Sequence, residues 1–132
     1  MNEVLNFLKE TKVFYLATVD GDKPKVRPFG FVMEFEGKLY FATNESKPSF
    51  AQLKANPNLE ISSTNAANEW IRLYGEAVFD PRPEVKAKMF EVAPHLGEMY
   101  SKPGAPVLGI FYVNNGEATF SSMTAAPRTV KF

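Results

Sequence analysis

The chain has 132 residues, 45% of them hydrophobic, and this length fits one domain, residues 1–132, with a substantial core. Fifteen basic and fifteen acidic side chains give a net charge of zero, which argues against a nucleic-acid-binding protein held by phosphate neutralisation. Without cysteine and with a single histidine, the chain offers no disulfide, no thiolate chemistry and no histidine-rich metal site.

The N-terminal segment MNEVLNFLKE lacks the apolar core of a signal peptide, and no apolar run approaches the roughly 20 residues of a membrane-spanning helix. We therefore expect a cytoplasmic protein that does not enter a membrane. Val4, Leu5 and Leu8 fall at helical spacing, which predicts a short amphipathic helix over residues 2–10 with Asn2 as its cap.

Alternating β-forming residues predict three antiparallel strands in the next segment. The first runs to Val19 and turns at Asp20-Gly21, and the second runs from Lys25 to Phe35. The third strand, KLYFAT, follows a tight turn at Glu36-Gly37. Because short turns join these strands, we expect them to lie side by side as a meander.

The hydrophobic period then changes, which predicts a helix over residues 48–55. Two caps compete: Ser46, or Ser49 with Gln52 in an S-x-x-Q capping box. Either arrangement leaves free backbone N–H groups beside Lys47 and Ser49.

The residue patterns of four later segments predict strands. LEISSTN and EWIRLYGEAVFD come first, and the second of them puts Trp70, Arg72 and Tyr74 on one face. VLGIFYV and GEATFSS follow near the C-terminus, separated by a predicted turn at 114–116.

Residues 84–93, between these pairs of strands, predict a helix with Val85, Met89 and Val92 along its buried side. A segment rich in Pro and Gly, residues 94–106, follows as a loop and serves either as a rigid rim or as a lid.

Six or seven mostly antiparallel strands with short helices favour a mainly β fold, a small closed or split β-barrel, because closure removes exposed strand edges. Twelve Phe and five Tyr are more than the interior of such a barrel needs. We infer that some of them line a dimer interface, where aromatic residues are enriched.

A phosphate site needs fixed cations, hydroxyl donors and backbone N–H groups, preferably at a helix N-terminus. Arg27 on the second strand, Thr43 and Asn44 at the end of the third, and Lys47 and Ser49 at the helix start supply these groups. Adjacency of the second and third strands is expected to bring Arg27 close to Lys47. The alternative is that both cations are solvated surface charges and that Ser49 is only a cap.

These residues also form a recognisable order: R-P-F-G, then F-A-T-N, then S-K-P-S-F-A-Q-L-K-A-N-P, then N-E-W-I-R-L-Y-G-E-A. This order resembles the pyridoxamine 5′-phosphate oxidase-like family of FMN-binding split β-barrels, above all its short, single-domain members. The resemblance extends from the first helix to about Ser121. It implies a homodimer with two FMN molecules at the subunit interface, each contacted by both chains.

Matched position by position, the resemblance implies that Arg27 and Lys47 bind the FMN phosphate, assisted by Thr43, Asn44 and Ser49. It places the isoalloxazine ring and the ribityl chain along the segment that contains Val26, Pro28, Phe29 and Gly30. Gln52 reaches the ring or the ribityl hydroxyls, or is only a capping residue.

Trp70 and Arg72 are the best candidates for the contribution of the other subunit. Trp70 is alternatively a core or interface residue. Arg72 alternatively forms a cross-strand ion pair with Glu60 or Glu76.

Pyridoxamine phosphate oxidases carry a C-terminal Arg-x-His pair for the substrate phosphate, and this chain, which ends in TAAPRTVKF, has none. Oxidation of pyridoxamine phosphate is therefore not expected. His95, the lone histidine, is either a solvent-exposed loop residue or a general acid over the flavin.

The resemblance leaves several functions open. The first is an FMN-dependent oxidoreductase that uses NAD(P)H to reduce a flavin, nitro or quinone compound, a class that includes nitroimidazole-resistance reductases. The second is a non-catalytic FMN-binding storage or sensor protein. Binding of deazaflavin F420 or haem, and a cofactor-free interaction module, complete the alternatives.

Overall fold

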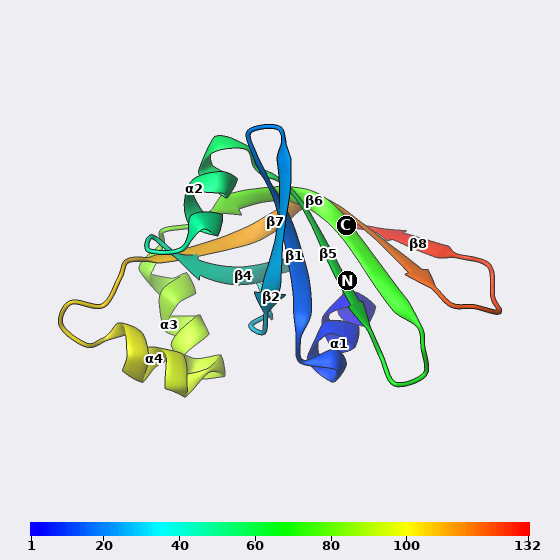
Figure 1. The fold of residues 1–132 in the computed structure, drawn as a ribbon. Helices are drawn as coiled ribbons and strands as arrows, with labels where there is room; N and C mark the ends of the chain where they lie inside the picture. Colours follow the sequence, from blue (N-terminus) through cyan, green and yellow to red (C-terminus); the bar gives the residue numbers. More distant parts are fainter.

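The computed structural model describes residues 1–132 as eight antiparallel strands and four short helices (Figure 1). In chain order the elements are α1 (Asn2–Thr11), β1 (Phe14–Asp20), β2 (Lys23–Phe29), β3 (Met33–Phe35), β4 (Lys38–Asn44), α2 (Pro48–Ala55), β5 (Asn58–Thr64), β6 (Trp70–Phe79), α3 (Pro83–Val92), α4 (Pro94–Tyr100), β7 (Leu108–Ser121) and β8 (Arg128–Lys131).

The strands form one sheet in the order β2-β1-β5-β6-β7-β4-β3, and β8 pairs with β7. No pairing joins β2 to β3 at the two ends of this path, so the sheet is not closed and the fold is a split barrel. The predicted mainly β split-barrel class is confirmed. The predicted count of six or seven strands was too low, since the sheet has eight.

The predicted meander was wrong, because its second strand is two strands. β2 ends at Phe29 and pairs with β1, whereas β3 begins at Met33 and pairs with β4. The chain crosses from one end of the sheet to the other through residues 30–32, so β2 and β4 are not neighbours. β2 contains Pro24 and Pro28, which lack a backbone N–H and suit an edge strand.

The predicted turn at 114–116 was also wrong, because β7 continues through it for 14 residues. The register against β6 shifts between Tyr74 and Glu76, which marks a β-bulge, and Asn115 takes a φ of 53°. Asn tolerates this left-handed conformation better than most residues, so a turn sequence here bends a strand instead of ending it. β8, which the sequence did not predict, pairs with the C-terminal part of β7.

Two groups of buried side chains make the core. The larger has 16 residues and packs the inner face of the sheet against α1, where the predicted Val4 and Leu8 are fully buried. The smaller lies under α3 and includes Val85 and Met89, as predicted, but Val92 is exposed. Figure 1 shows α3 and α4 together at the left end of the molecule, and α1 apart from them, below β1 and β5.

None of the predicted helix caps is found. α1 begins at Asn2 itself, so Asn2 is not its cap. The N-cap of α2 is Lys47, without a side-chain hydrogen bond, so both the Ser46 and the Ser49–Gln52 arrangements were wrong. Pro48 explains the start of this helix, because its fixed φ suits the first helical position.

No helix in the structure has the length and apolar character needed to span a membrane.

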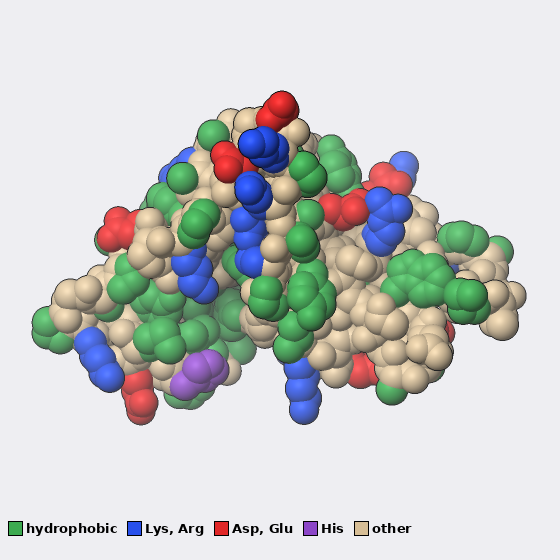
Figure 2. Space-filling model, viewed as in Figure 1, with side chains coloured by type: hydrophobic (Ala, Val, Ile, Leu, Met, Phe, Trp, Pro, Cys, Tyr) green, Lys and Arg blue, Asp and Glu red, His purple; other side chains and the backbone are tan.

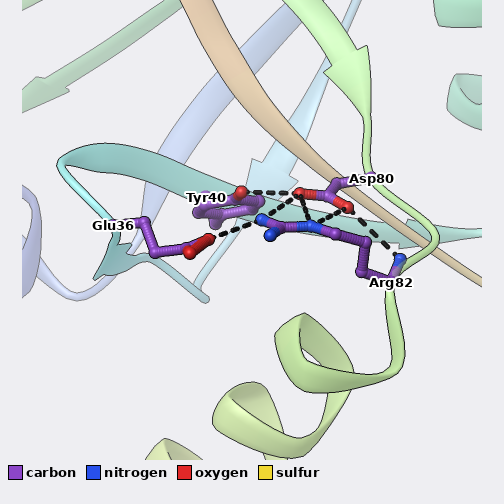
Figure 3. A network of polar contacts seen from close by, with 4 residues as sticks. All are labelled: Glu36, Tyr40, Asp80 and Arg82. Atoms are coloured by element: carbon purple, nitrogen blue, oxygen red, sulfur yellow. Dashed lines mark hydrogen bonds and ion pairs between the residues drawn. The ribbon is translucent and has the colours of Figure 1, made fainter.

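A polar network links the β3–β4 turn to the start of α3 (Figure 3). The hydroxyl of Tyr40 donates to Asp80 Oδ2 at 2.7 Å, and the guanidinium of Arg82 donates to both Asp80 and Glu36. The hydrogen bond from Arg82 is the main cause that lowers the pKa of Asp80 to about 2. Burial and the hydrogen bond to Asp80 raise the pKa of Tyr40 to about 12. No local pattern predicts this network, because it joins two pairs of residues, Glu36 with Tyr40 and Asp80 with Arg82, whose connecting contacts span 40 and 46 positions of the chain.

The depressed pKa of Asp80 predicts a loss of stability in acid. The unfolded chain binds a proton at this carboxyl near pH 4, and the folded chain does so only near pH 2. The free energy of unfolding therefore falls by about 2 kcal/mol as the pH falls through this window. Urea unfolding of Asp80→Asn should show a deficit of about this size at pH 7 that nearly disappears at pH 2. Asp22→Asn, in the exposed β1–β2 turn, is the control; equal deficits in the two variants would contradict the assignment.

Candidate functional site

A cavity of about 420 Å³ lies between the segment that links β2 to β3, the start of α2, and the helices α3 and α4. Eight of its twelve lining residues are hydrophobic, and its polar side chains come from Lys47, His95 and Tyr100. Figure 2 shows the single histidine next to hydrophobic side chains at this end of the molecule. A volume of this size with an apolar lining and few polar groups is typical of a small-molecule site.

Arg27 on β2 is held in place by neutral acceptors. Its guanidinium donates to Thr18 Oγ1 and to Gln52 Oε1, each at 2.7 Å, and more weakly to the carbonyl of Leu16 at 3.4 Å. No carboxylate pairs with it, and burial lowers its pKa. An arginine remains protonated in spite of such a shift, so this position carries a fixed positive charge without a negative partner.

Lys47, the second predicted cation, is exposed at the start of α2. Its Nζ lies 5.8 Å from the ring centroid of Phe29, and it forms no ion pair. Because Arg27 and Phe29 are two residues apart on β2, they share a face, on which Arg27 contacts Gln52 of α2 and Phe29 contacts Lys47 just before α2. The expectation that adjacency of β2 and β4 brings the two cations together was wrong. The hydrogen bond from Arg27 to Gln52 and the approach of Lys47 to Phe29 place both cations along one face of β2.

Thr43, Asn44 and Ser49 are buried where β4 leads into α2. The hydroxyls of Thr43 and Ser49 hydrogen-bond to each other at 2.7 Å. The Asn44 side chain accepts from the backbone N–H and the hydroxyl of Ser46, and donates to Tyr100. Each side chain therefore has a protein partner and fixes the position of the α2 N-terminus.

Gln52 is a hydrogen-bond partner of Arg27 and not a helix-capping residue. Its Oε1 accepts from both Arg27 and Thr18. Sequence reasoning missed Thr18, although a signal existed. Thr18 follows Phe14 and Leu16 at the inward positions of β1, where a polar side chain needs a buried partner.

Only part of the segment predicted to contact the flavin ring lines the cavity. Pro28, Phe29 and Gly30 line the cavity, whereas the side chain of Val26 is exposed and does not. Val26 and Arg27 are consecutive on β2, so they point to opposite faces of the sheet.

Trp70 and Arg72 lie on the outer face of β6 and do not line the cavity of their own chain. Arg72 forms the alternative cross-strand ion pair with Glu60, at 2.9 Å. Its side chain is 62% exposed, so the pair contributes at most about 1 kcal/mol.

The predicted loop 94–106 was wrong in its first half, which forms α4. This helix supplies His95, Leu96 and Tyr100 to the cavity wall. His95 is exposed, as the first of the two alternatives predicted for it requires, and it also lines the cavity. Sequence reasoning missed Tyr100 because nothing local distinguishes it from other half-buried tyrosines.

Comparison with known proteins agrees with this fold. Residues 1–130 match the family model described as pyridoxamine 5′-phosphate oxidase. A NimC/NimA family protein from Clostridium acetobutylicum is 45% identical over 100% of this chain and 92% of its own, with a TM-score of 0.93. No curated protein matches the sequence.

More distant solved structures share the fold. A pyridoxamine 5′-phosphate oxidase-related, FMN binding protein from Nostoc punctiforme is 14% identical over 99% of this chain and 95% of its own, with a TM-score of 0.64. A heme binding protein from Mycobacterium smegmatis is 14% identical over 92% of this chain and 53% of its own, with a TM-score of 0.70. By the family match and the 45% identity, the chain belongs to the pyridoxamine 5′-phosphate oxidase family.

Proposed function

We propose that the protein is an FMN-dependent oxidoreductase that uses NAD(P)H to reduce a small organic acceptor such as a flavin, nitro or quinone compound. The observation that carries this proposal is the guanidinium of Arg27, held on neutral partners next to an apolar cavity. A fixed cation without a carboxylate partner fits a ligand that brings its own negative charge. Membership of the family and the FMN binding relative from Nostoc punctiforme support FMN as that ligand.

The donor set fits FMN in two parts. Arg27, Lys47 and the backbone N–H of Ser49, which is the one such group of residues 46–50 without a protein acceptor, would bind the phosphate. The side chains of Thr43, Asn44 and Ser49 hold that helix start in place. Residues 28–30, where the cavity is largely apolar and the strand end offers N–H and C=O groups, would hold the ring. When bound, FMN supplies the hydride and electron transfer, and these residues bind it, orient it and exclude water.

A visible spectrum of the purified protein, followed by anaerobic mixing with NADH or NADPH, tests the proposal. Absorbance of bound oxidised flavin and its bleaching by either donor are expected. Flavin that no donor bleaches would favour storage or sensing over catalysis. A Soret band would favour haem, and a colourless protein that takes up no added FMN would contradict the proposal.

We further propose that the active form is a homodimer. Tyr15, Val26, Trp70 and Tyr74 point to the outer face of β2, β1 and β6, as strand register and alternation require. The exposed fractions of Tyr15, Val26 and Tyr74 are 51%, 67% and 47%. Large apolar side chains gathered on one sheet face suit a partner surface better than water. A second copy would also bring Trp70 and Arg72 to the flavin, a place they do not reach in their own chain.

Trp70→Ala tests this arrangement. Because Trp70 is only partly buried within the chain, its truncation should weaken the dimer or the flavin complex more than the fold. Sedimentation equilibrium and FMN titration measure the first two effects, and urea unfolding measures the third. Val92→Ala, an exposed apolar residue on α3, is the control. Loss of folding stability with an unchanged dimer would show that Trp70 is a core residue instead.

A further inference from the structure

Tyr100, the last residue of α4, stands between two cavities. It lines the cavity of about 420 Å³ described above, and also a second one of about 310 Å³ that extends towards Arg82 and Val107. Leu108 is the only other residue that both cavities share. Tyr100 is therefore part of the dividing wall, opposite the end of β2.

The direction of its hydrogen bond can be determined. The backbone N–H of Ser46 can only donate, and it donates to Asn44 Oδ1 at 3.0 Å. This contact fixes the orientation of the Asn44 amide, so its Nδ2 faces Tyr100 and donates to the hydroxyl at 2.8 Å. The Tyr100 oxygen therefore accepts a hydrogen bond, and its own O–H makes no hydrogen bond to any other group of the chain. This leaves one positioned donor at an otherwise largely apolar wall.

From this geometry we propose that Tyr100 is a specificity-determining hydrogen-bond donor for the electron acceptor, which is a flat ring carrying a carbonyl or nitro oxygen. Leu96 and Leu108 give the ring an apolar surface, and the hydroxyl meets its oxygen. The inference rests on the proposed function, in which the flavin lies along residues 28–30. α4 then forms the opposite wall, so Tyr100 faces the acceptor and not the flavin.

Tyr100→Phe removes the donor and keeps the ring, so α4 and its packing are retained. The probes are menadione, a quinone, and 2-methylnaphthalene, which has the same carbon skeleton without the two oxygens. Calorimetric titration of FMN-loaded protein should show menadione binding weakened about three- to tenfold by the variant, the usual range for one neutral hydrogen bond. Binding of 2-methylnaphthalene and of FMN should be unchanged. Tyr112→Phe is the matched control. The hydroxyl that it removes lies outside the cavity and makes no hydrogen bond.

Three results would overturn the inference. Equal weakening of both probes would show that Tyr100 only supports the wall, and no weakening of either would show that it makes no contact. Weaker FMN binding with unchanged menadione binding would assign the donor to the flavin. If the wild-type protein takes up no FMN, the proposed function fails by itself, and the same comparison of the two probes is made on the flavin-free protein.

Discussion

Replacement of both Arg27 and Lys47 by alanine is expected to weaken FMN binding by about 3–6 kcal/mol, on the scale of two charge-assisted contacts to a phosphate. The fold should persist, because neither side chain belongs to the buried core. Arg27 should account for the larger share. Its guanidinium is already positioned by Thr18 and Gln52, so little side-chain entropy is lost on binding, whereas exposed Lys47 must be ordered. Titration of FMN fluorescence with each single variant and with the double variant measures the contribution of Arg27 and that of Lys47 to the binding free energy.

Riboflavin, which lacks the phosphate, separates the phosphate site from the ring site. The double variant should bind riboflavin as the wild type does. Lys54→Ala is the matched control, since Lys54 is an exposed lysine within α2 that contacts the rings of Phe50 and Phe79 instead of the cavity. A double variant that purifies with full flavin would show that the phosphate lies elsewhere.

Gly109→Val is expected to be the most damaging single substitution near the site. Gly109 lies on β7 opposite Thr43 of β4. A Cβ at this position would lie 2.6 Å from Phe50 Cδ2 and 2.9 Å from Phe79 Cε1. The ring of Phe50 belongs to α2, so the clash pushes this helix away from the sheet. We expect a loss of about 3 kcal/mol in the free energy of unfolding, the upper range for overpacking. FMN binding should also weaken, because α2 carries Gln52 and begins directly after Lys47.

A double variant tests whether the clash with Phe50 is the cause. Phe50→Ala removes the ring that the new side chain meets, so Gly109→Val with Phe50→Ala should be more stable than the sum of the single losses predicts. Urea unfolding of the four proteins gives the coupling energy. Strictly additive losses would show that the damage arises elsewhere, for example at Phe79.

Local features of the fold could be predicted because they depend on neighbouring residues. Glu36-Gly37 takes left-handed φ angles at both positions, as the tight turn between β3 and β4 requires. The alternation in β6 correctly separates exposed Arg72 and Tyr74 from buried Ile71 and Leu73. In each case the pattern of a few residues determines the local conformation.

The errors share a different physical cause. Residues 25–35 read as one strand because alternation does not reveal which partner each half has, and the partners of β2 and β3 lie at opposite ends of the sheet. Asn114-Asn115-Gly116 has the composition of a turn, but pairing with β6 and β8 on both sides keeps β7 extended. Pairing with distant strands therefore overrides the local preference of these three residues for a turn.

The sequence by itself determined the split-barrel class, the family, and the residue types of the candidate phosphate site, Arg27 and Lys47, because composition, periodicity and motif order are properties of the chain alone. Only the tertiary structure decided that Arg27 of β2 reaches Gln52 of α2, that Thr18 and Gln52 hold Arg27, and that Tyr100 lines the cavity while it accepts from Asn44. These contacts join residues between 9 and 56 positions apart. Such pairs form only when the packed core brings their elements together, so no local pattern encodes them.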